Sequence, residues 1–205
     1  LLGRHGRAFA SAAFLLLLII VVGAGVAVLP TFSHAQSTQT ARAPVGGRFM
    51  LQAHDGKVMT DQDFRGRFML ITFGYTWCPD VCPMALSTMS EALEELGKDA
   101  EKVVPVFVSV DPKRDTVSRL DAYVEHFHPR LVGLTGPKPM IDKTAERYKV
   151  KYAMVADKDG DPDGYTVDHT ASVYLMGPHG EFRVKFMYNI DPEAMAARIR
   201  EALAE

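Results

Sequence analysis

The chain has 205 residues, of which 47% are hydrophobic and 23% are charged, and its formal net charge is −2. This length suits one domain of ordinary size with a short appendage. The composition excludes a disordered, collagenous or coiled-coil protein, and the near-neutral charge argues against a nucleic-acid binder that uses a basic face. The two cysteines can form one disulfide or part of a metal site, but not a multi-bridge secreted scaffold.

A long apolar run near the N-terminus predicts a membrane anchor. The segment between Arg7 and Arg42 carries no charge, and it contains the 18 apolar residues of Ala12–Leu29. As a helix these residues span about 27 Å, close to the ~30 Å hydrocarbon core of a bilayer. Because Arg4 and Arg7 precede the run, the positive-inside rule leaves the N-terminus in the cytoplasm. We therefore expect residues 1–30 to anchor the chain in a bacterial inner membrane, with the rest on the periplasmic side.

A signal peptide is the alternative interpretation of this segment. Ser33-His34-Ala35 has small residues where a signal peptidase requires them, and cleavage after Ala35 would release a soluble exported domain. Residues 31–47 are rich in Ser, Thr, Gln and Gly and predict a flexible tether. The folded domain is expected at 48–205. The part beyond the anchor keeps all 25 acidic residues and loses two of the 23 basic ones, so its net charge is −4.

The strands of this domain are predicted from turn signals and apolar runs. The Asp55-Gly56 turn between Phe49–Ala53 and Val58-Met59 predicts a β-hairpin. Two continuous apolar runs, at 68–75 and 103–110, predict strands that are buried on both faces. Further strands are expected at 131–134, 151–156, 171–176 and 181–187.

Helices are expected between these strands, at 83–96, 116–127 and 139–148, and at the C-terminus. Gly97 is the expected stop of the first helix and Asp115 the expected N-cap of the second. Asp191-Pro192-Glu193 opens a last helix that ends at Leu203. Buried strands that alternate with helices, followed by a hairpin and a closing helix, predict an α/β sandwich of the thioredoxin kind.

The two cysteines lie between a predicted strand and a predicted helix, in the segment Gly74-Tyr75-Thr76-Trp77-Cys78-Pro79-Asp80-Val81-Cys82-Pro83. At this Cys-x-x-x-Cys spacing, a helical turn places both sulfurs on one side, and a helix N-terminus favours thiolate over thiol. Thiolates bind metals and also attack disulfides. The spacing is wider than the usual Cys-x-x-Cys redox motif and leaves room for a metal ion, whereas a single bracing disulfide is the structural alternative.

Among the seven histidines, His169 is the best candidate for a third metal ligand. It directly precedes the predicted strand 171–176, and ligands gather in the loops at strand ends of α/β sheets. Asp168 beside it is a candidate to fix the imidazole tautomer. By contrast, His54 lies in the hairpin turn, and His126 and His128 are typical of a solvated helix end.

The Asp-rich stretch 157–164 resembles a calcium-binding loop. Pro162 and Asp168 stand where an EF-hand requires glycine and glutamate, so the pattern favours a solvated turn.

Three separated motifs together resemble the Sco/SenC copper chaperones. They are Gly74–Pro83, Val110-Asp111-Pro112-Lys113-Arg114-Asp115-Thr116, and Asp168-His169-Thr170-Ala171-Ser172-Val173-Tyr174-Leu175. The resemblance runs from about Phe49 to the C-terminus and includes the N-terminal anchor. It implies a thioredoxin-like fold, copper bound by Cys78, Cys82 and His169, and a role in assembling the binuclear copper centre of cytochrome c oxidase.

The resemblance also bears on acidic residues around these ligands. Asp111 and Asp115 match the family's acidic motif. Together with Asp80 and Asp168, they are expected to hold the ligands in position without binding the metal, or to stabilise the surrounding structure. Soft thiolates suit Cu(I) and imidazole suits Cu(II), although two cysteines and a histidine can also form a zinc site.

The leading hypothesis is a copper chaperone, mainly a metal-binding and transfer protein. The alternative is a thiol–disulfide reductase in which Cys78 and Cys82 are redox-active and keep the acceptor's cysteines reduced. A cysteine peroxidase is a third interpretation, but no arginine-activated cysteine is evident in the sequence. Expected partners are the copper-accepting subunit of cytochrome c oxidase or another copper chaperone, a thiol reductant and the membrane, and not a nucleic acid.

Overall fold

The computed structural model describes residues 44–156 and 164–205. The apolar run Ala12–Leu29, the cleavage site after Ala35 and the Asp-rich stretch from 157 to 163 lie outside these ranges. Within the ranges, no helix is both long enough and apolar enough to cross a membrane.

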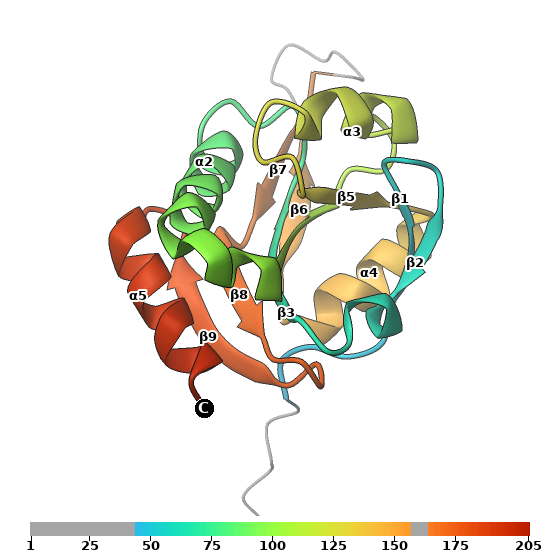
Figure 1. Ribbon diagram of the computed structural model, residues 1–205. Helices are drawn as coiled ribbons and strands as arrows, with labels where there is room; N and C mark the ends of the chain where they lie inside the picture. Colours follow the sequence, from blue (N-terminus) through green and yellow to red (C-terminus); the bar gives the residue numbers. More distant parts are fainter. Residues whose placement is uncertain (1–43, 157–163) are drawn as a thin grey trace, which may run out of the picture. The chain divides into compact units, whose positions relative to one another are not determined.

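A seven-stranded mixed sheet organises the domain, in the order β2-β1-β5-β4-β3-β8-β9 (Figure 1). Strands β3, β4 and β5 are parallel, whereas β1 and β8 run antiparallel to their neighbours in this central group. The predicted hairpin is confirmed, because β1 pairs antiparallel with β2. The strands are β1 Met50–Ala53, β2 Val58–Thr60, β3 Phe68–Gly74, β4 Val103–Ser109, β5 Val132–Thr135, β8 Ser172–Met176 and β9 Phe182–Met187.

Helices cover both faces of this sheet, as the apolar runs of β3 and β4 predict. They are α2 Val81–Leu96, α3 Val117–Val124, α4 Lys138–Arg147 and α5 Pro192–Leu203. Side chains alternate along the strands, so that Leu70 packs in the core beneath α2, α3 and α5 while Ile71 packs in the core beneath α4. The result is the three-layered, thioredoxin-like α/β sandwich that the sequence predicts.

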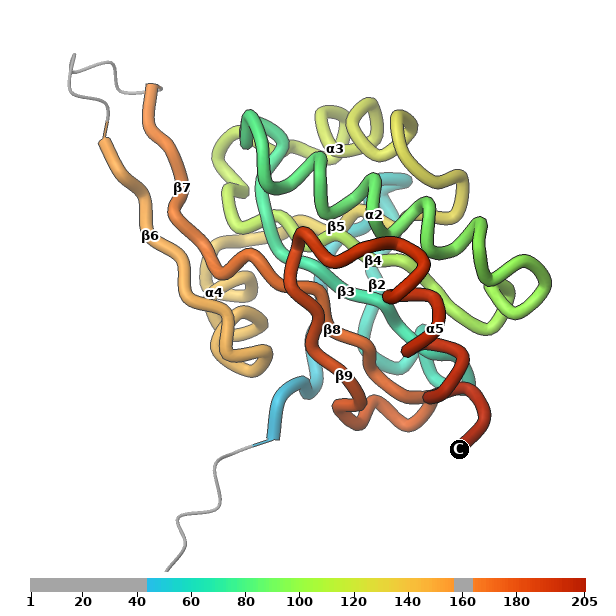
Figure 2. Tube along the Cα trace, turned by 90° about the vertical axis from the view of Figure 1, so that its left-hand side faces the viewer, coloured from blue at the N-terminus to red at the C-terminus, as the bar shows by residue number. Residues whose placement is uncertain are grey.

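A two-stranded ribbon of β6 (Tyr152–Val155) and β7 (Thr166–His169) lies on the α4 side of the sheet, separate from it (Figure 2). β6 matches the strand predicted at 151–156, whereas β7 lies where a loop was expected to carry His169. Val167 is 3% exposed and joins the core beneath α4, which holds the ribbon against the domain. Because Tyr152 is the partner of His169 in the ribbon, the position of His169 is set by strand pairing.

Two helix starts differ from prediction. α2 begins at Val81, two residues earlier than expected, so Cys82 lies in its first turn. The predicted N-cap Asp115 is wrong: Thr116 is the N-cap of α3, and its hydroxyl accepts a hydrogen bond from the backbone N–H of Arg119. Asp115 is completely buried, and its carboxylate bonds other elements instead.

Candidate metal centre

The two cysteines lie where β3 ends and α2 begins. A turn, in which the N–H of Cys78 donates to the carbonyl of Tyr75, places Cys78 ahead of the helix. Cys82 follows in the first helical turn, and its N–H donates to Cys78 Sγ at 3.4 Å. Both cysteines are free thiols, 9% and 4% exposed respectively. The predicted placement of the pair at a helix N-terminus is therefore confirmed.

Gly74, the last residue of β3, makes room for this arrangement. A β-carbon at that position would lie 2.4 Å from Cys82 Sγ and 2.9 Å from the ring of Phe107. Real side chains do not approach so closely, so only glycine lets α2 start directly against the end of the strand. The sequence analysis did not single out Gly74.

His169 reaches the same point from a segment 87 residues further along the chain. Its Nε2 lies 3.3 Å from Cys82 Sγ, and its Nδ1 lies 3.0 Å from the carbonyl oxygen of Val167. A carbonyl can only accept, so we assign the ring proton to Nδ1. The lone pair of Nε2 then points toward Cys82. This is the tautomer that a metal-binding imidazole requires.

The prediction that Asp168 fixes the tautomer is therefore wrong, because the carbonyl of Val167 does so. Asp168 itself is exposed and lies opposite Ala153 in the ribbon. Tyr75 is a further contact that sequence reasoning missed: it packs edge-on against the His169 ring, with centroids 5.8 Å apart.

The environment of Cys78 favours its thiolate. The S–H of Cys82 is the main cause, and the backbone N–H groups of Asp80 and Cys82 and the nearby His169 add to it, so the pKa of Cys78 falls to about 5. Burial opposes the shift. Asp80 therefore acts through its N–H, because its carboxylate makes no capping hydrogen bond to α2.

The same coupling raises the pKa of Cys82, since its proton is shared with the Cys78 sulfur and the thiol is buried. The pair thus holds one negative charge at neutral pH. A metal that binds both sulfurs must displace the remaining proton.

The Asp115 carboxylate holds the loop that connects β3 to α2 in place. Its carboxylate accepts hydrogen bonds from the N–H of Thr76 (3.0 Å), the Thr76 hydroxyl (2.7 Å) and the Ser109 hydroxyl (2.6 Å). Burial raises the pKa of Asp115, although these hydrogen bonds oppose the rise. The acidic motif therefore reaches the loop at Thr76 and not at a cysteine.

Asp111 instead links β4 to the segment that leads into β7. Its fully buried carboxylate accepts from Arg114 Nε (2.5 Å) and from the Tyr165 hydroxyl (2.7 Å). Arg114 also donates to the Tyr165 carbonyl at 2.9 Å and stacks over that ring at 3.7 Å. Arg114 and Tyr165 were not singled out from the sequence, although Arg114 lies inside the acidic motif and Tyr165 four residues before His169.

The candidate ligands are gathered but not closed around one point. In the described ranges, no group of three or more His, Cys, Asp or Glu side chains stands ready to hold a metal ion. Cys82 and His169 are in contact, whereas Cys78 faces the amide of Cys82. His54 and His128 take part in local backbone contacts, accepting from the N–H groups of Gly133 and Arg130.

These features define a class of protein: a thioredoxin-like domain in which a Cys-x-x-x-Cys pair at a helix N-terminus faces a histidine. The profile of the SCO1/SenC family matches residues 37–204. The chain belongs to the SCO1/SenC family.

Relatives of known name support this assignment. The chain is 38% identical over 156 residues to an SCO2-like protein of Rickettsia conorii, covering 76% of both chains. It is 43% identical over 157 residues to the mitochondrial SCO1 homolog of Homo sapiens, a match that covers 76% of this chain but 52% of the human protein. Bradyrhizobium japonicum ScoI, solved with copper bound, is 45% identical with a TM-score of 0.70, covering 77% of this chain and 98% of ScoI.

Gly74→Ala is expected to displace Cys82. The new methyl group overlaps the sulfur, so we expect a loss of about 1–3 kcal/mol in the free energy of unfolding and weaker metal binding. Gly136→Ala is the matched control, because its β-carbon meets the flexible end of Leu51 at 3.3 Å and reaches backbone atoms only at 3.9 Å. Urea denaturation and competitive metal titration measure both effects. Equal behaviour of the two variants would contradict the role of Gly74.

Asp115→Asn keeps the shape of the side chain but turns one acceptor into a donor that faces other donors. We expect a loss of about 1–3 kcal/mol in the free energy of unfolding, measured by urea denaturation. Asp121→Asn, on the exposed side of α3, is expected to change it by less than about 0.5 kcal/mol. A stable Asp115→Asn variant would mean that the loop is held by other contacts.

Alkylation of the metal-free protein reports the charge on Cys78. Since its pKa is lowered to about 5, we expect Cys78 to react before Cys82, at a rate that is constant from neutral pH down to about pH 6 and falls near pH 5. Cys82→Ala removes the main stabilising contact, so the drop in rate should move to higher pH. A wild-type rate that keeps climbing through pH 8 would indicate an ordinary thiol at Cys78.

Proposed function

We propose that this protein is a copper metallochaperone that binds Cu(I) and Cu(II) through Cys78, Cys82 and His169. The acceptor implied by the family resemblance is the binuclear copper centre of cytochrome c oxidase. The observation that carries the proposal is the 3.3 Å contact between Cys82 Sγ and His169 Nε2, two donor atoms that the fold brings together from distant segments. Copper in the ScoI relative supports the choice of metal.

The donor set fits copper chemically. Thiolates are soft ligands that stabilise Cu(I), and the imidazole adds a borderline donor that also suits Cu(II). With metal–sulfur and metal–nitrogen distances of about 2.3 and 2.0 Å, a tetrahedral or trigonal ion holds the two donor atoms about 3.5–3.8 Å apart. Cys82 and His169 therefore have to separate by only a few tenths of an ångström, and Cys78 has to turn its sulfur from the Cys82 amide toward them.

The site is also suited to release. Cys78 is already a thiolate and is the more exposed of the two sulfurs, at 9% against 4%, so it can be the first ligand to meet copper and the last to hold it. A partner's cysteines can replace the ligands one at a time, and the departure of copper returns one proton to the pair of Cys78 and Cys82. A metal carrier needs such stepwise exchange, whereas a closed structural site resists it.

We place this exchange outside the cytoplasm, on a domain that residues 1–30 tether to the membrane. The length and apolarity of Ala12–Leu29 support the anchor, and Arg4 and Arg7 ahead of it support the orientation. Cleavage after Ala35 remains the alternative, with a soluble domain as the product.

A thiol–disulfide reductase is the second candidate, favoured by the lowered pKa of Cys78 beside a second free thiol. In this reaction the Cys78 thiolate attacks an acceptor disulfide and Cys82 then displaces the acceptor. The protein gains one disulfide, and two electrons pass to the acceptor's cysteines, which take up one proton from Cys82 and a second from solvent to become two thiols. The reaction needs no histidine.

His169→Ala separates the two functions. The reduced, full-length protein is loaded with copper without oxygen and then exposed to Cu(II), and bound copper and the thiolate-to-copper charge-transfer band are measured. We expect about one copper per wild-type chain, and loss of the band with at least a tenfold lower affinity in His169→Ala, Cys78→Ser and Cys82→Ser. His126→Ala, an exposed histidine far from the thiols in sequence, is the control and should bind as wild type.

Undiminished copper binding and an unchanged band in His169→Ala would refute the three-ligand site. Oxidation of Cys78 and Cys82 to a disulfide with no retained copper, together with full function of His169→Ala in cells, would favour the reductase.

A further inference from the structure

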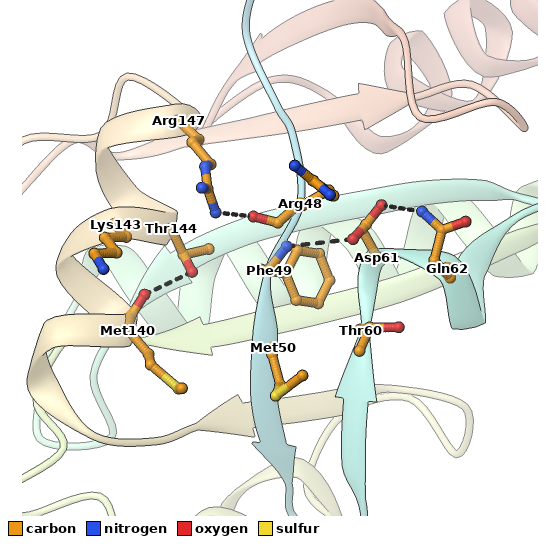
Figure 3. A pocket seen from close by; sticks show the side chains of 10 residues that line it. All are labelled: Arg48, Phe49, Met50, Thr60, Asp61, Gln62, Met140, Lys143, Thr144 and Arg147. Carbon is orange, nitrogen blue, oxygen red and sulfur yellow. Dashed lines mark hydrogen bonds between the residues drawn. The ribbon is translucent and has the colours of Figure 1, made fainter.

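A groove lies between β1, β2 and α4 (Figure 3), and none of the candidate metal ligands lines it. Its volume is about 370 Å³. Phe49, Met50 and Met140 form an apolar wall, and Arg48, Lys143 and Arg147 line the same groove with positive charge. We call the pocket that these side chains line the cationic groove.

Among the described residues, no carboxylate neutralises the charges of the groove. Within residues 44–156 and 164–205, no carboxylate forms an ion pair with Arg48, Lys143 or Arg147. The one acidic side chain of the groove, Asp61, is paired with Arg65 at 2.9 Å and accepts the N–H of Phe49. A positive surface therefore persists on a domain whose net charge is negative.

Two of the three apolar side chains in the groove are open to solvent. Met50 is 53% exposed and Met140 is 42% exposed, and both belong to the groove. A surface with unpaired cations beside exposed apolar side chains fits a ligand that is anionic at one end and apolar at the other. A phospholipid headgroup with its glycerol region has this character, because arginine and lysine bind phosphate while methionine contacts the apolar part.

The position of the groove places it at the point where the tether enters the domain. Gly46 donates to the Arg147 carbonyl at 2.9 Å, and the Arg147 side chain donates to the Arg48 carbonyl. A β-carbon on Gly46 would touch Met176, which pairs with Met69 near the start of β3. The cysteines follow the other end of β3, so the length of this strand, about 20 Å, separates them from the tether entry.

The chain length outside the described residues brings a bilayer within reach of the groove. The apolar run ends at Leu29, and 14 residues connect it to Pro44. Even a fully extended chain of this length reaches no further than about 50 Å. The tether therefore lets the groove approach the bilayer to within a Debye length, where basic residues are attracted to anionic headgroups.

We infer that the cationic groove binds anionic phospholipid headgroups of the bilayer that holds the anchor. The inference rests on the membrane anchoring proposed above. The contact orients the domain, with the tether entry against the membrane and the cysteine–histidine site about one strand length away from it. The tether then sets where the site can meet a membrane-bound acceptor, and the groove sets which way the site faces.

The test uses the full chain reconstituted in vesicles, with the recognition sequence of a site-specific protease in place of residues 36–41. After the tether is cut, the vesicles are floated and the fraction of the domain that stays with them is measured. Vesicles of phosphatidylcholine alone are compared with vesicles that also contain phosphatidylglycerol. We expect retention on the phosphatidylglycerol vesicles at low salt, and release at high salt, where screening shortens the reach of the charges.

Charge reversal locates the contact. In Arg48→Glu/Lys143→Glu we expect the bound-to-free ratio to fall by roughly tenfold or more, because basic residues near an anionic surface each add to the attraction. Arg147 is left unchanged because its side chain also holds the backbone. Lys98→Glu/Lys185→Glu changes the net charge equally, outside the groove, and should release far less of the domain.

Several outcomes would overturn the inference. They are equal retention on both kinds of vesicle, equal release of the two charge-reversed variants, and failure of the uncut chain to float with vesicles. Thermal unfolding of each variant checks that it is folded. Copper binding is measured on the same proteins and should be unchanged in Arg48→Glu/Lys143→Glu, so a failure of the copper proposal is distinguishable from a failure of the lipid contact.

Discussion

The absence of a side chain at Gly74 is the constraint on which the candidate metal centre depends. It lets the first turn of α2 pack directly against the end of β3, with Cys82 Sγ in the space that a β-carbon would occupy. From there the Cys82 sulfur meets His169, and the helix N–H groups and the Cys82 thiol stabilise a thiolate at Cys78. A bulkier residue at position 74 would displace Cys82, so that the three donor atoms would no longer lie close enough to bind one metal ion.

Two buried carboxylates connect the candidate metal centre to the rest of the domain. Asp115 binds Thr76 and Ser109, and so ties the cysteine loop to β4. Asp111 binds Tyr165 through its hydroxyl and ties β4 to the segment that leads to His169. The acidic motif therefore connects the loop that carries the cysteines to the segment that carries His169. In the described structure, neither carboxylate makes a hydrogen bond to a candidate ligand.

The length of β3 separates the thiols from the point where the tether enters the domain. The thiols lie at the carboxyl end of the strand, among hydrogen bonds that favour negative charge on sulfur. The cationic groove lies near the tether entry, where Gly46 contacts Arg147. Because the interior of the domain is closely packed, a contact at the tether entry also orients the thiols. A tethered carrier can use this arrangement to present its cargo in a constant direction.

The sequence predicted a structural element correctly wherever one short segment contained the whole pattern for it. The apolar runs of β3 and β4, the Asp55-Gly56 hairpin and the helical spacing after Pro83 predicted their elements because burial on defined faces dictates residue period. The Cys-x-x-x-Cys pair and His169 were likewise recognisable as chemistry. Prediction was wrong for Asp115, since its hydrogen bonds to Thr76 and Ser109 take precedence over capping the adjacent helix. It also missed β7, whose four residues include one buried apolar side chain, Val167.

The amino-acid order alone thus settled the fold class, the location of the thiols at a helix N-terminus and membership in a family defined by separated motifs. Tertiary structure alone decided that His169 Nε2 lies 3.3 Å from Cys82, that the Val167 carbonyl selects its tautomer, and that Arg48 and Lys143 share one groove. The physical reason is that these relations join residues distant in the chain. Local propensity acts between near neighbours, whereas such contacts depend on how the sheet and helices pack as a whole.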